Sequence, residues 1–511
     1  MRSTVILLAI AATATAIAQP IVHEVAELIP PSLSSGDDFG DAVAISDEVV
    51  AVGAPGDDDQ GDNAGAVYLF NGQTYGYLTT ITPPIVQDNQ RFGFALETGN
   101  NAVFVGAPFT EDPQGRERGK VYLYGATGIG PVREFEPEPT NEAEPNDLFG
   151  WSIASRPGLV AIGAPLDDGA NEDGGAVYVF VNSLPPIVIR PDDQNDGDHF
   201  GWSVALDGDL LLVGAPEHTS SLQSKGAAYV FDVSTGDQLA KVASPIVSSA
   251  ATDFGSAVSV RNNRLLIGAR FADTNAQNAG QAFTYIYDPS TQSVLPETTL
   301  AEPLPAQNAR FGGSASIGDG ITAIGAPSNA PSGEAFVYTN GQPTPFARFF
   351  PSIPEGLAQF GEAIDTDGER FTIGAYFSLD GGRAFVFEKP LEALAQPRDF
   401  IAIPNDIIEL LFQVGALGSE ARYQWRKDGQ PISDLSLYDG FDTEQLFIVA
   451  GPQTIGVYDC VVTTQTQTII SDSAIVAVRN DCPADQNFDG ILDPADFNAW
   501  VLNYHRGCDA R

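Results

Sequence analysis

The sequence predicts a mainly β protein in which residues 19–389 form a seven-bladed β-propeller. The first observation is a long internal repeat, because FGWSVALDGDLLLVGAP at 200–216 nearly copies FGWSIASRPGLVAIGAP at 149–165. The second is that each copy contains several short apolar runs of β character. The third is that no segment of this region has a convincing helical period. Units of about fifty residues with several short strands each are typical of propeller blades.

The repeat occurs in seven copies. Each copy opens with a Phe-Gly pair, at spacings of 49 to 57 residues, and the pairs begin at Phe39, Phe92, Phe149, Phe200, Phe254, Phe311 and Phe360. A Gly-Ala-Pro segment follows, altered only at 268–270 and 374–376, and then a segment of the type Gly-Ala-Val-Tyr-Leu-Phe. We expect the glycines to serve turns and close backbone approach, and each Phe to pack between blades. The repeated motif is therefore predicted to be architectural.

Four strands are expected in each blade. Runs such as SVAL, LLLVGA and AAYVF are four to six residues long, and a fourth run precedes the next Phe-Gly pair. The N-terminal run HEVAELIPP, from His23, looks like one of these fourth runs. We expect it to pair with the last copy around residues 384–387 and so to close the ring.

These motifs resemble the FG-GAP repeat family, the blade motif of the integrin α-subunit propeller and of many exported bacterial proteins. The resemblance covers about residues 30–390. It implies an extracellular binding scaffold, often in adhesion, although some relatives lie beside enzyme domains. Integrin-type blades carry a calcium loop between Phe-Gly and Gly-Ala-Pro, and that interval is too short and too poor in acids here. The similarity is therefore to the variety without calcium loops.

Acidic loops follow Gly-Ala-Pro in two of the copies. Their carboxylates are Asp57, Asp58, Asp59, Asp62, Asp167, Asp168, Glu172 and Asp173. Such side chains are suited to a hard cation, but Asp, Asn and Gly also favour ordinary solvated turns. The corresponding loops of the other copies are not consistently acidic, which favours the turn.

Residues 390–480 are predicted to form a separate β-sandwich. Trp425 lies in a predicted strand, and Tyr458 precedes Cys460 by two residues in a later one. This pattern resembles the immunoglobulin-like sandwich, with Tyr458 as the tyrosine-corner residue. The upstream partner cysteine is missing, so we expect Cys460 to be a buried thiol. The resemblance implies a spacer or a general interaction surface.

Residues 481–511 contain the sharpest motif for chemistry. The segment from 485 to 496 has the spacing of an EF-hand loop, and its expected calcium ligands are Asp485, Asn487, Asp489, Ile491, Asp493 and Asp496. The ligands are side-chain oxygens at positions 1, 3, 5, 9 and 12 and a backbone carbonyl at position 7, with Gly490 at the sharp turn. A short α-helix is expected next, so this is a small α-helical calcium-loop module. A single loop with Asp at position 12 predicts weak Ca²⁺ binding, on the order of 10⁻⁴–10⁻³ M.

This tail resembles one half of a type I dockerin, because Asp stands at position 12 and Leu492 and Phe497 are placed as in that family. The resemblance implies attachment or sorting at the cell surface, although dockerins have two loops and this chain has one. Cys482 and Cys508 flank the loop and helix. We expect them to form a disulfide, because a module of about thirty residues is too small to hold a core.

The N-terminal segment and the net charge predict an exported protein. Residues 1–18 have the charged, apolar and Ala-Ile-Ala segments of a signal peptide. No later stretch is long and apolar enough for a membrane span. The formal charge of −42, from 67 acidic and 25 basic residues, argues against nucleic-acid and anionic-membrane partners. We expect a secreted protein, extracellular or at the cell surface.

No enzyme motif emerges from the sequence. The four histidines form no H-E-x-x-H motif, and the chain has no nucleophile elbow and no P-loop. We therefore predict a non-catalytic surface or matrix binding protein. Its propeller would bind an extracellular protein or polysaccharide, and its tail would bind an anchoring partner. A secreted polysaccharide-active enzyme, with an acidic pair on the propeller, and a structural envelope component remain as alternatives.

Overall fold

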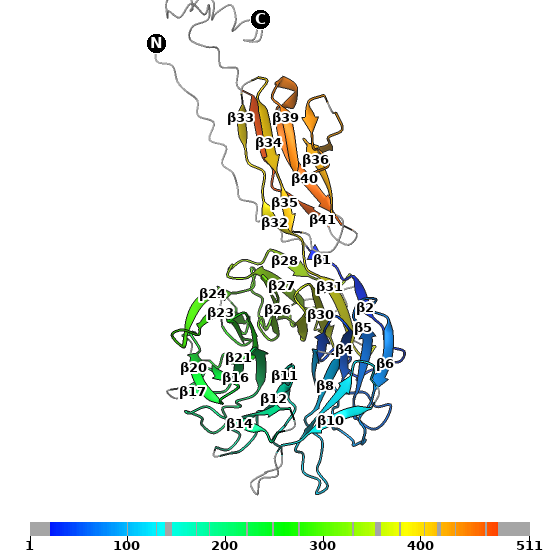
Figure 1. Ribbon diagram of the computed structural model, residues 1–511, viewed down its shortest axis with the longest axis vertical. Coiled ribbons are helices and arrows are strands. Elements are labelled where there is room, and N and C mark those ends of the chain that lie inside the picture. The colour runs from blue at the N-terminus through cyan, green and yellow to red at the C-terminus, as the bar shows by residue number, and fades with distance from the viewer. Residues whose placement is uncertain are drawn as a thin grey trace, which may run out of the picture. The chain divides into compact units, whose positions relative to one another are not determined.

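The computed structural model describes residues 21–478, apart from residues 100, 129, 138–145, 170, 183, 221–222, 248–249, 274–275, 330–331, 353–358, 378–379, 403, 416–420, 435 and 465–467. The chain divides into two compact units, residues 1–389 and 390–511. The regular secondary structure of the described residues consists of strands (Figure 1) and one 3₁₀ helix, η1 (Pro452–Thr454). No helix in this part of the chain has the length and apolar character that a membrane crossing needs.

The first unit consists of consecutive antiparallel sheets, which we number in chain order. Sheet 1 contains β3 (Val43–Ile45), β4 (Val49–Ala54), β5 (Ala66–Asn71) and β6 (Tyr77–Ile81). Sheet 2 contains β7 (Ala95–Gly99), β8 (Ala102–Ala107), β9 (Lys120–Gly125) and β10 (Pro131–Phe135). Sheet 3 contains β11 (Ser152–Arg156), β12 (Leu159–Ala164), β13 (Ala176–Val181) and β14 (Ile187–Ile189). Sheet 4 contains β15 (Ser203–Asp207), β16 (Leu210–Ala215), β19 (Ala227–Asp232) and β20 (Asp237–Ala243).

Three further sheets complete this unit. Sheet 5 contains β21 (Phe254–Arg261), β22 (Arg264–Ala269), β23 (Gln281–Asp288) and β24 (Ser293–Leu300). Sheet 6 contains β25 (Ala315–Ile317), β26 (Ile321–Ala326), β27 (Glu334–Thr339) and β28 (Ala347–Phe349), with β1 (Ile21–Val22) added in parallel. Sheet 7 contains β29 (Ile364–Thr366), β30 (Arg370–Ala375), β31 (Arg383–Glu388) and β2 (Ala26–Leu28). A small ribbon of β17 (Thr219–Ser220) and β18 (Gln223–Ser224) lies in a loop of sheet 4.

The first strands of the sheets contact one another in chain order. β3 contacts β7, β7 contacts β11, and the series continues through β15, β21 and β25 to β29. β29 also contacts β3, so the contacts return to their start, and Figure 1 shows the sheets arranged around a common centre. Four-stranded sheets in this arrangement are consistent with the blades of a propeller.

The second strand of most sheets is buried on both faces. In β4, β12, β16 and β26 every residue is buried. The cause is that each sheet is covered by a neighbouring sheet on either side. Such strands are near-continuous apolar runs rather than alternating ones, which explains segments such as LLLVGA.

One hydrophobic cluster lies at each junction between neighbouring sheets. The Phe of every Phe-Gly pair is fully buried, with 0% of its surface exposed. Phe92 of sheet 2, for example, packs in a cluster with Val49 and Leu69 of sheet 1 and Tyr122 of its own sheet. The prediction that the repeated aromatic packs between blades is confirmed.

The repeated glycines allow neighbouring sheets to approach closely. A Cβ added at Gly53, in the first Gly-Ala-Pro segment, would lie 2.1 Å from the carbonyl oxygen of Gly93 in the next Phe-Gly pair. A Cβ at Gly65 would lie 2.2 Å from the carbonyl oxygen of Phe92, and Gly65 has a φ of +82°. No other residue fits either position. The motif is thus explained by contacts between neighbouring sheets.

The N-terminal strand closes the last sheet, as the sequence predicted. β2 pairs antiparallel with β31, with Ala26 opposite Val386 and Leu28 opposite Ala384 (Figure 1). The Arg383 Nη1 atom also lies 2.9 Å from the Glu27 Oε1 atom. The outer strand of sheet 7 therefore comes from the opposite end of the repeat region.

The described residues of the second unit, up to residue 478, form strands and the helix η1. One sheet contains β33 (Phe400–Ala402), β42 (Ala474–Val478), β40 (Gly456–Thr463), β36 (Arg422–Lys427) and β37 (Gln430–Pro431), with β41 (Thr468–Ile470) beside β40. A second sheet contains β34 (Ile407–Leu411), β39 (Gln445–Val449) and β38 (Tyr438–Asp439). A ribbon of β32 (Glu392–Ala395) and β35 (Gln413–Gly415) completes the unit.

A single core lies among these sheets, and Trp425, Tyr458 and Cys460 are fully buried in it. The Tyr458 hydroxyl donates a 2.6 Å hydrogen bond to the carbonyl oxygen of Thr454. The Trp425 indole N–H donates to the carbonyl oxygen of Thr443 at 2.9 Å. Cys460 is a free thiol whose pKa is raised to about 12 by burial. The prediction of a buried thiol is confirmed.

Candidate functional site

The calcium ligands predicted in the tail lie outside the described residues. They are Asp485, Asn487, Asp489, Ile491, Asp493 and Asp496, and the same holds for Cys482 and Cys508. The signal-peptide residues also lie outside this range. The candidate site described below is therefore formed by residues between 21 and 478.

The acidic loops of the repeats are tied into hydrogen bonds of the fold. The Asp57 Oδ2 atom accepts a 2.7 Å hydrogen bond from the hydroxyl of Tyr68, a strand residue of sheet 1. Asp167 accepts one of 2.6 Å from Tyr178 in the equivalent place and also pairs with Arg190. These contacts favour the turn over the cation site. Among the described residues, no group of three or more His, Cys, Asp or Glu side chains is arranged to hold a metal ion.

A better candidate lies where the first strand of each sheet begins. We define the rim as the residues that directly precede and directly follow each Phe-Gly pair, together with the two residues after each Gly-Ala. The preceding residues are Asp38, Arg91, Leu148, His199, Asp253, Arg310 and Gln359. The following residues are Asp41, Phe94, Trp151, Trp202, Ser256, Gly313 and Glu362. These positions vary between copies, whereas the Phe-Gly pairs between them do not.

Every residue that precedes a Phe-Gly pair has a positive φ. The values lie between 50° and 58°, and none of these residues is glycine. This left-handed conformation suits Gly, Asn and Asp and disfavours other residues. Arg91, Leu148, His199, Arg310 and Gln359 nevertheless occupy five of the seven positions. Local turn chemistry does not explain these side chains.

Sheets 2, 3 and 4 contribute an aromatic arc to the rim. The ring of Phe94 lies 4.5 Å from that of Trp151, between centroids, and Trp151 lies 4.8 Å from Trp202. His199 stacks on Trp202 at 6.1 Å. Phe94, Trp151 and Trp202 are partly exposed, in contrast to the buried Phe residues of the repeat. The arc is therefore a continuous aromatic surface that solvent reaches.

Arginines lie at both ends of the aromatic arc. The Arg91 guanidinium lies 5.9 Å from the ring centre of Phe109, which itself packs against Phe94. Arg270 lies 5.6 Å from the ring centre of Trp202 and donates a 2.9 Å hydrogen bond to Asp253.

Arg310 continues the basic part of the rim on sheet 6. Its guanidinium lies 5.8 Å from the ring centre of Phe271, the residue that Arg270 also covers. Within the described part of the chain, neither the Arg91 nor the Arg310 side chain makes a hydrogen bond or ion pair. Both guanidinium groups thus lack a hydrogen-bonded partner in that part of the chain, although Arg91 interacts electrostatically with Asp38 and Asp41 and Arg310 with Glu362.

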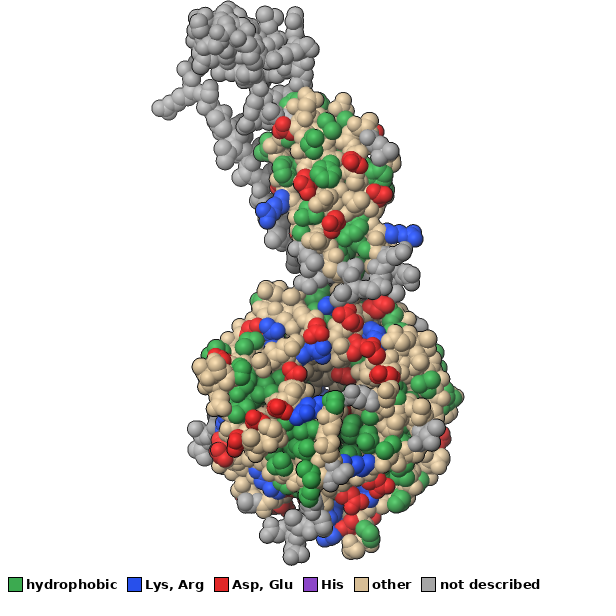
Figure 2. All heavy atoms as spheres, in the orientation of Figure 1, with side chains coloured by type: hydrophobic (Ala, Val, Ile, Leu, Met, Phe, Trp, Pro, Cys, Tyr) green, Lys and Arg blue, Asp and Glu red, His purple; other side chains and the backbone are tan. Residues whose placement is uncertain are grey.

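Carboxyl groups occupy the remaining part of the rim, on sheets 7 and 1. Burial, together with the nearby charge of Glu362, raises the pKa of Asp41 to about 7. Burial also raises the pKa of Glu362, while Arg310 and Arg270 act to lower it. The Glu362 Oε2 atom has no hydrogen-bond partner in the described structure. Figure 2 shows acidic and basic side chains close together around the hollow centre of one face of this unit.

Comparison with known proteins agrees with this architecture. The model of the FG-GAP repeat family matches residues 22–70, 140–180, 188–231 and 246–285. The chain therefore contains FG-GAP repeats in these four regions. No curated protein matches.

Three solved structures are similar to a short part of this chain. The titin M10–obscurin-like 1 Ig complex is 24% identical over 18% of this chain and 94% of that chain, with a TM-score of 0.16. Duf (Kirre) D1 is 19% identical over 18% and 97%, with a TM-score of 0.16. Titin domain M3 is 19% identical over 17% and 96%, with a TM-score of 0.16.

The fourth FG-GAP repeat contains a buried histidine that has no counterpart in the other copies. The His218 Nδ1 atom lies 2.8 Å from the Asp198 Oδ2 atom, and its Nε2 atom lies 2.7 Å from the Lys241 Nζ atom. Because the lysine ammonium is a donor only, the Nε2 lone pair is already used. A His-Asp pair in this state has no free base for catalysis. The cluster of His218, Asp198 and Lys241 occupies the place in the fourth repeat where, in the first repeat, Asp57 accepts a hydrogen bond from Tyr68.

Glu97 and Asp365 form a second buried carboxyl pair in the first unit. Glu97 and Asp365 occupy the same position of repeats 2 and 7, five residues after the Phe. Burial and the charge of Asp365 raise the pKa of Glu97 to about 8. Burial raises the pKa of Asp365 to about 6, although it accepts a 2.9 Å hydrogen bond from the Ile45 N–H. Two carboxyls with separated pKa values are a pattern used in acid-base catalysis.

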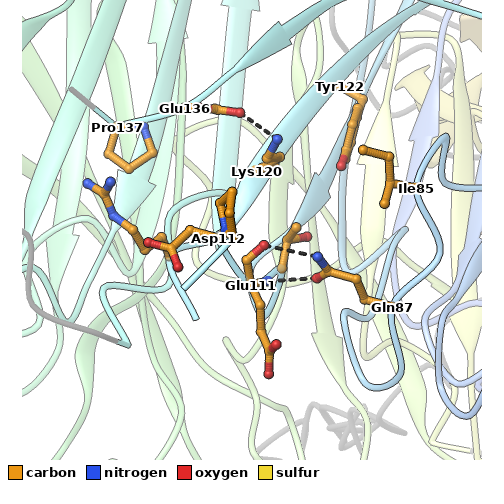
Figure 3. A pocket seen from close by; sticks show the side chains of 12 residues that line it. Ile85, Gln87, Glu111, Asp112, Lys120, Tyr122, Glu136 and Pro137 are labelled. Carbon is orange, nitrogen blue, oxygen red and sulfur yellow. Dashed lines mark hydrogen bonds and ion pairs between the residues drawn. The ribbon is translucent and has the colours of Figure 1, made fainter. Parts of the chain in front are cut away.

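The unit also has a pocket of about 350 Å³ between the loops that follow β6 and β8. Figure 3 shows Lys120 turned toward Glu136, and Gln87 turned toward Glu111. Lys120 forms a 2.5 Å ion pair with Glu136, and the Gln87 side chain bonds the backbone of Glu111. Burial alone would lower the Lys120 pKa, but the Glu136 pair outweighs it and the pKa is raised. Lys120 in this pocket is therefore paired, unlike Arg91 and Arg310.

Proposed function

We propose that this FG-GAP repeat protein is an exported, non-catalytic binding protein whose seven-bladed propeller holds an extracellular ligand at the rim. The observation that carries the proposal is the left-handed conformation of Arg91, Leu148, His199, Arg310 and Gln359. Strained backbone of this kind costs roughly 1 kcal/mol or more at each position and persists where function requires it. Glycine would remove the strain, so the side chains themselves are the retained feature.

Several contacts support a closed propeller of seven blades. The first strands contact one another in a series that returns from β29 to β3. The N-terminal β2 completes the outer edge of sheet 7. A closed ring leaves its sheets few free edges, and it fixes rim residues from all repeats in one arrangement. Binding residues on short loops held by a rigid scaffold are a common solution.

We propose that residues 390–480 form an Ig-like spacer. The hydrogen bond from the Tyr458 hydroxyl to the Thr454 carbonyl supports this, because a tyrosine corner has the same connection. The burial of Trp425 against Cys460 in the core is also in keeping with such a domain. The spacer would carry the binding unit away from the attachment point.

We propose that residues 481–511 bind Ca²⁺ and attach or sort the protein at the cell surface, in the manner of a dockerin-like module. The support is the EF-hand spacing of Asp485, Asn487, Asp489 and Asp496. The test is retention of the mature protein on isolated cell envelopes, with calcium and with chelator. The intact chain is compared with a chain truncated before Asp481. Retention that survives truncation would exclude the tail as the anchor.

The binding function of the rim is tested separately. Extracellular matrix polymers from the organism that produces the protein are passed over immobilised intact protein. Their capture is measured by biolayer interferometry. Replacing Trp151 and Trp202 by Ala, or Arg91 by Gly, is expected to lower capture at least tenfold. The matched control is Arg133→Ala, because Arg133 also covers an aromatic ring, 4.3 Å from the centre of Phe135, but lies outside the rim. Equal capture by all four proteins would contradict the proposal.

The second candidate function is a polysaccharide-active enzyme, and the Glu97–Asp365 pair favours it. A carboxyl with a pKa of about 8 beside one with a pKa of about 6 has the protonation states of a general acid and its partner. Reducing ends released from a panel of acidic polysaccharides would report turnover. Turnover that disappears in Glu97→Gln would replace the non-catalytic proposal.

A further inference from the structure

We propose that the rim binds an acidic polysaccharide, with sugar rings on the aromatic arc of Phe94, Trp151 and Trp202 and the acid groups on Arg91 and Arg310. This inference rests on the proposed function, because it names the chemical class of the ligand at the same site. It is argued from the arrangement of the arc, the state of the arginines and the neighbouring acids.

The aromatic arc has the form of an extended platform. Its three main rings come from the same position of three successive repeats. Neighbouring rings lie 4.5 and 4.8 Å apart and are tilted by 46° and 53°, so they form one continuous surface. Large, rigid aromatic side chains present an apolar face at little cost in conformational entropy. A polymer of repeating flat rings fits a surface built from repeating aromatic positions.

The arginines supply the complementary charge at the two ends of this platform. Arg91 lies over Phe109 at one end, and Arg310 lies over Phe271 beyond Trp202 and Arg270 at the other. Stacking on an aromatic ring orients a guanidinium while leaving its N–H donors available. The planar fork matches a carboxylate or a sulfate in two parallel hydrogen bonds. Neither side chain has such a partner among the described residues.

A cationic ligand fits this surface poorly. Cations bind to the faces of aromatic rings, but a cation on the arc would lie near the guanidinium groups of Arg91 and Arg270, which contact Phe109 and Trp202. A second positive group would meet like charge at both ends of the arc. The arrangement therefore selects for an anionic ligand.

The neighbouring acids oppose an anion less than their number suggests. Asp253 is already bonded to Arg270. Asp41 has a pKa of about 7 because of burial and the charge of Glu362, and burial raises the pKa of Glu362 as well. Near neutral pH Asp41 therefore carries less negative charge than an ordinary carboxylate. Carboxyl and carboxylate groups also provide donors and acceptors for sugar hydroxyls.

Long-range repulsion does not exclude the ligand either. The chain carries a formal charge of −42, but at physiological ionic strength charges separated by more than about 8 Å are largely screened. The groups in direct contact with the polymer then decide binding. At low salt the screening length is about 30 Å, so overall repulsion is expected to weaken capture there.

The test uses the intact mature protein and four soluble polymers in affinity electrophoresis at 150 mM salt. Alginate carries carboxylates, dextran sulfate carries sulfates, dextran is neutral, and poly-L-glutamate is an acidic peptide. We expect alginate, dextran sulfate or both to retard the protein, and dextran and poly-L-glutamate to have at most a tenth of that effect. Arg91→Gly, Arg310→Gly and Trp151→Ala should each weaken the retardation at least tenfold, and Arg133→Ala should leave it unchanged.

Other outcomes separate the ligand class from the proposed function. Retardation by dextran or poly-L-glutamate as strong as by the acidic polysaccharides, and sensitive to the same rim variants, would overturn the ligand class and leave the rim as the binding face. The same conclusion follows if no acidic polymer binds but matrix polymers are still captured through the rim. Retardation that none of the rim variants changes would overturn both proposals. Circular dichroism of each variant confirms that a loss of binding is not a loss of fold.

Discussion

Gly374 of the last repeat lies against the backbone of Gly40 in the first repeat, and a Cβ at Gly374 would come within 1.8 Å of the Gly40 carbonyl oxygen. The equivalent contact recurs between neighbouring repeats, as between Gly53 and Gly93. The junction where the two ends of the repeat region meet is thus built like the junctions inside it. Closure requires the same glycine that every other junction requires.

Gly374→Ala is therefore expected to destabilise the first unit strongly. The added methyl group overlaps backbone that cannot move without shifting a whole sheet, and the expected loss is about 3 kcal/mol or more in the free energy of unfolding. Urea denaturation of the purified protein measures this loss. The matched control is Gly99→Ala, because a Cβ there meets nothing within 4 Å. Equal stability of the two variants would show that the junction is looser than these contacts indicate.

Arg310→Gly should separate stability from binding. Arg310 has a φ of +58°, which glycine adopts freely. We expect the free energy of unfolding to stay the same or to rise by up to about 1 kcal/mol, while capture of the ligand falls. Denaturation and binding are measured on the same preparation. A marked loss of stability would mean that Arg310 serves the fold, and would remove the main argument for the rim.

The Glu97–Asp365 pair predicts a dependence of stability on pH. The pKa of Glu97 rises from 4.5 to about 8 in the folded protein because of burial and the Asp365 charge. The folded state then holds a proton that the unfolded state has lost. This contribution to stability is fully present below about pH 4.5 and is lost as the pH rises to about 8.

Glu97→Gln is expected to flatten this profile between pH 5 and 8, because the amide has no proton to lose. Thermal unfolding at a series of pH values measures the slope. Glu111→Gln serves as the control, since Glu111 is an exposed carboxyl of the same sheet. A slope that persists unchanged in Glu97→Gln would assign the effect to other carboxyls, such as Asp41.

Tyr458→Phe tests the corner of the second unit. The Tyr458 hydroxyl donates to the Thr454 carbonyl and lies 3.2 Å from the Tyr438 hydroxyl. Its removal leaves a buried carbonyl without a partner, at an expected cost of about 1–3 kcal/mol. Tyr77→Phe, which removes a hydroxyl from an exposed tyrosine, should cost almost nothing. A neutral effect of Tyr458→Phe would argue against a tyrosine corner that stabilises the domain.

Much of the fold could be predicted from the sequence because the repeat is dense and its constraints are local. The Phe-Gly and Gly-Ala-Pro segments recur at every junction, and the strand run from His23 looked like a fourth strand that lacked a sheet. Pairing of Ala26 with Val386 followed from that likeness.

The rim was not predicted, for a physical reason. A single copy of the repeat shows Arg91 or Trp151 only as a variable neighbour of a Phe-Gly pair. Their significance depends on closure of the ring, which brings variable positions of all copies to one end of the sheets. The positive φ of Arg91 has no sequence signal either, because arginine does not favour that conformation. A position-by-position comparison of the seven copies would have revealed the variable residues of the rim.

The pairing of β2 with β31 has a consequence for how the chain is made. Translation produces Glu27 long before Arg383, so β2 has no sheet to join until the whole repeat region has left the ribosome. During that interval β2 is an unpaired strand, and the β31 edge of another molecule fits it as well as its own. Removal of β2 would leave the β31 edge of sheet 7 open in the folded protein. Variants that lack β2 are therefore expected to form dimers or larger chains through this edge.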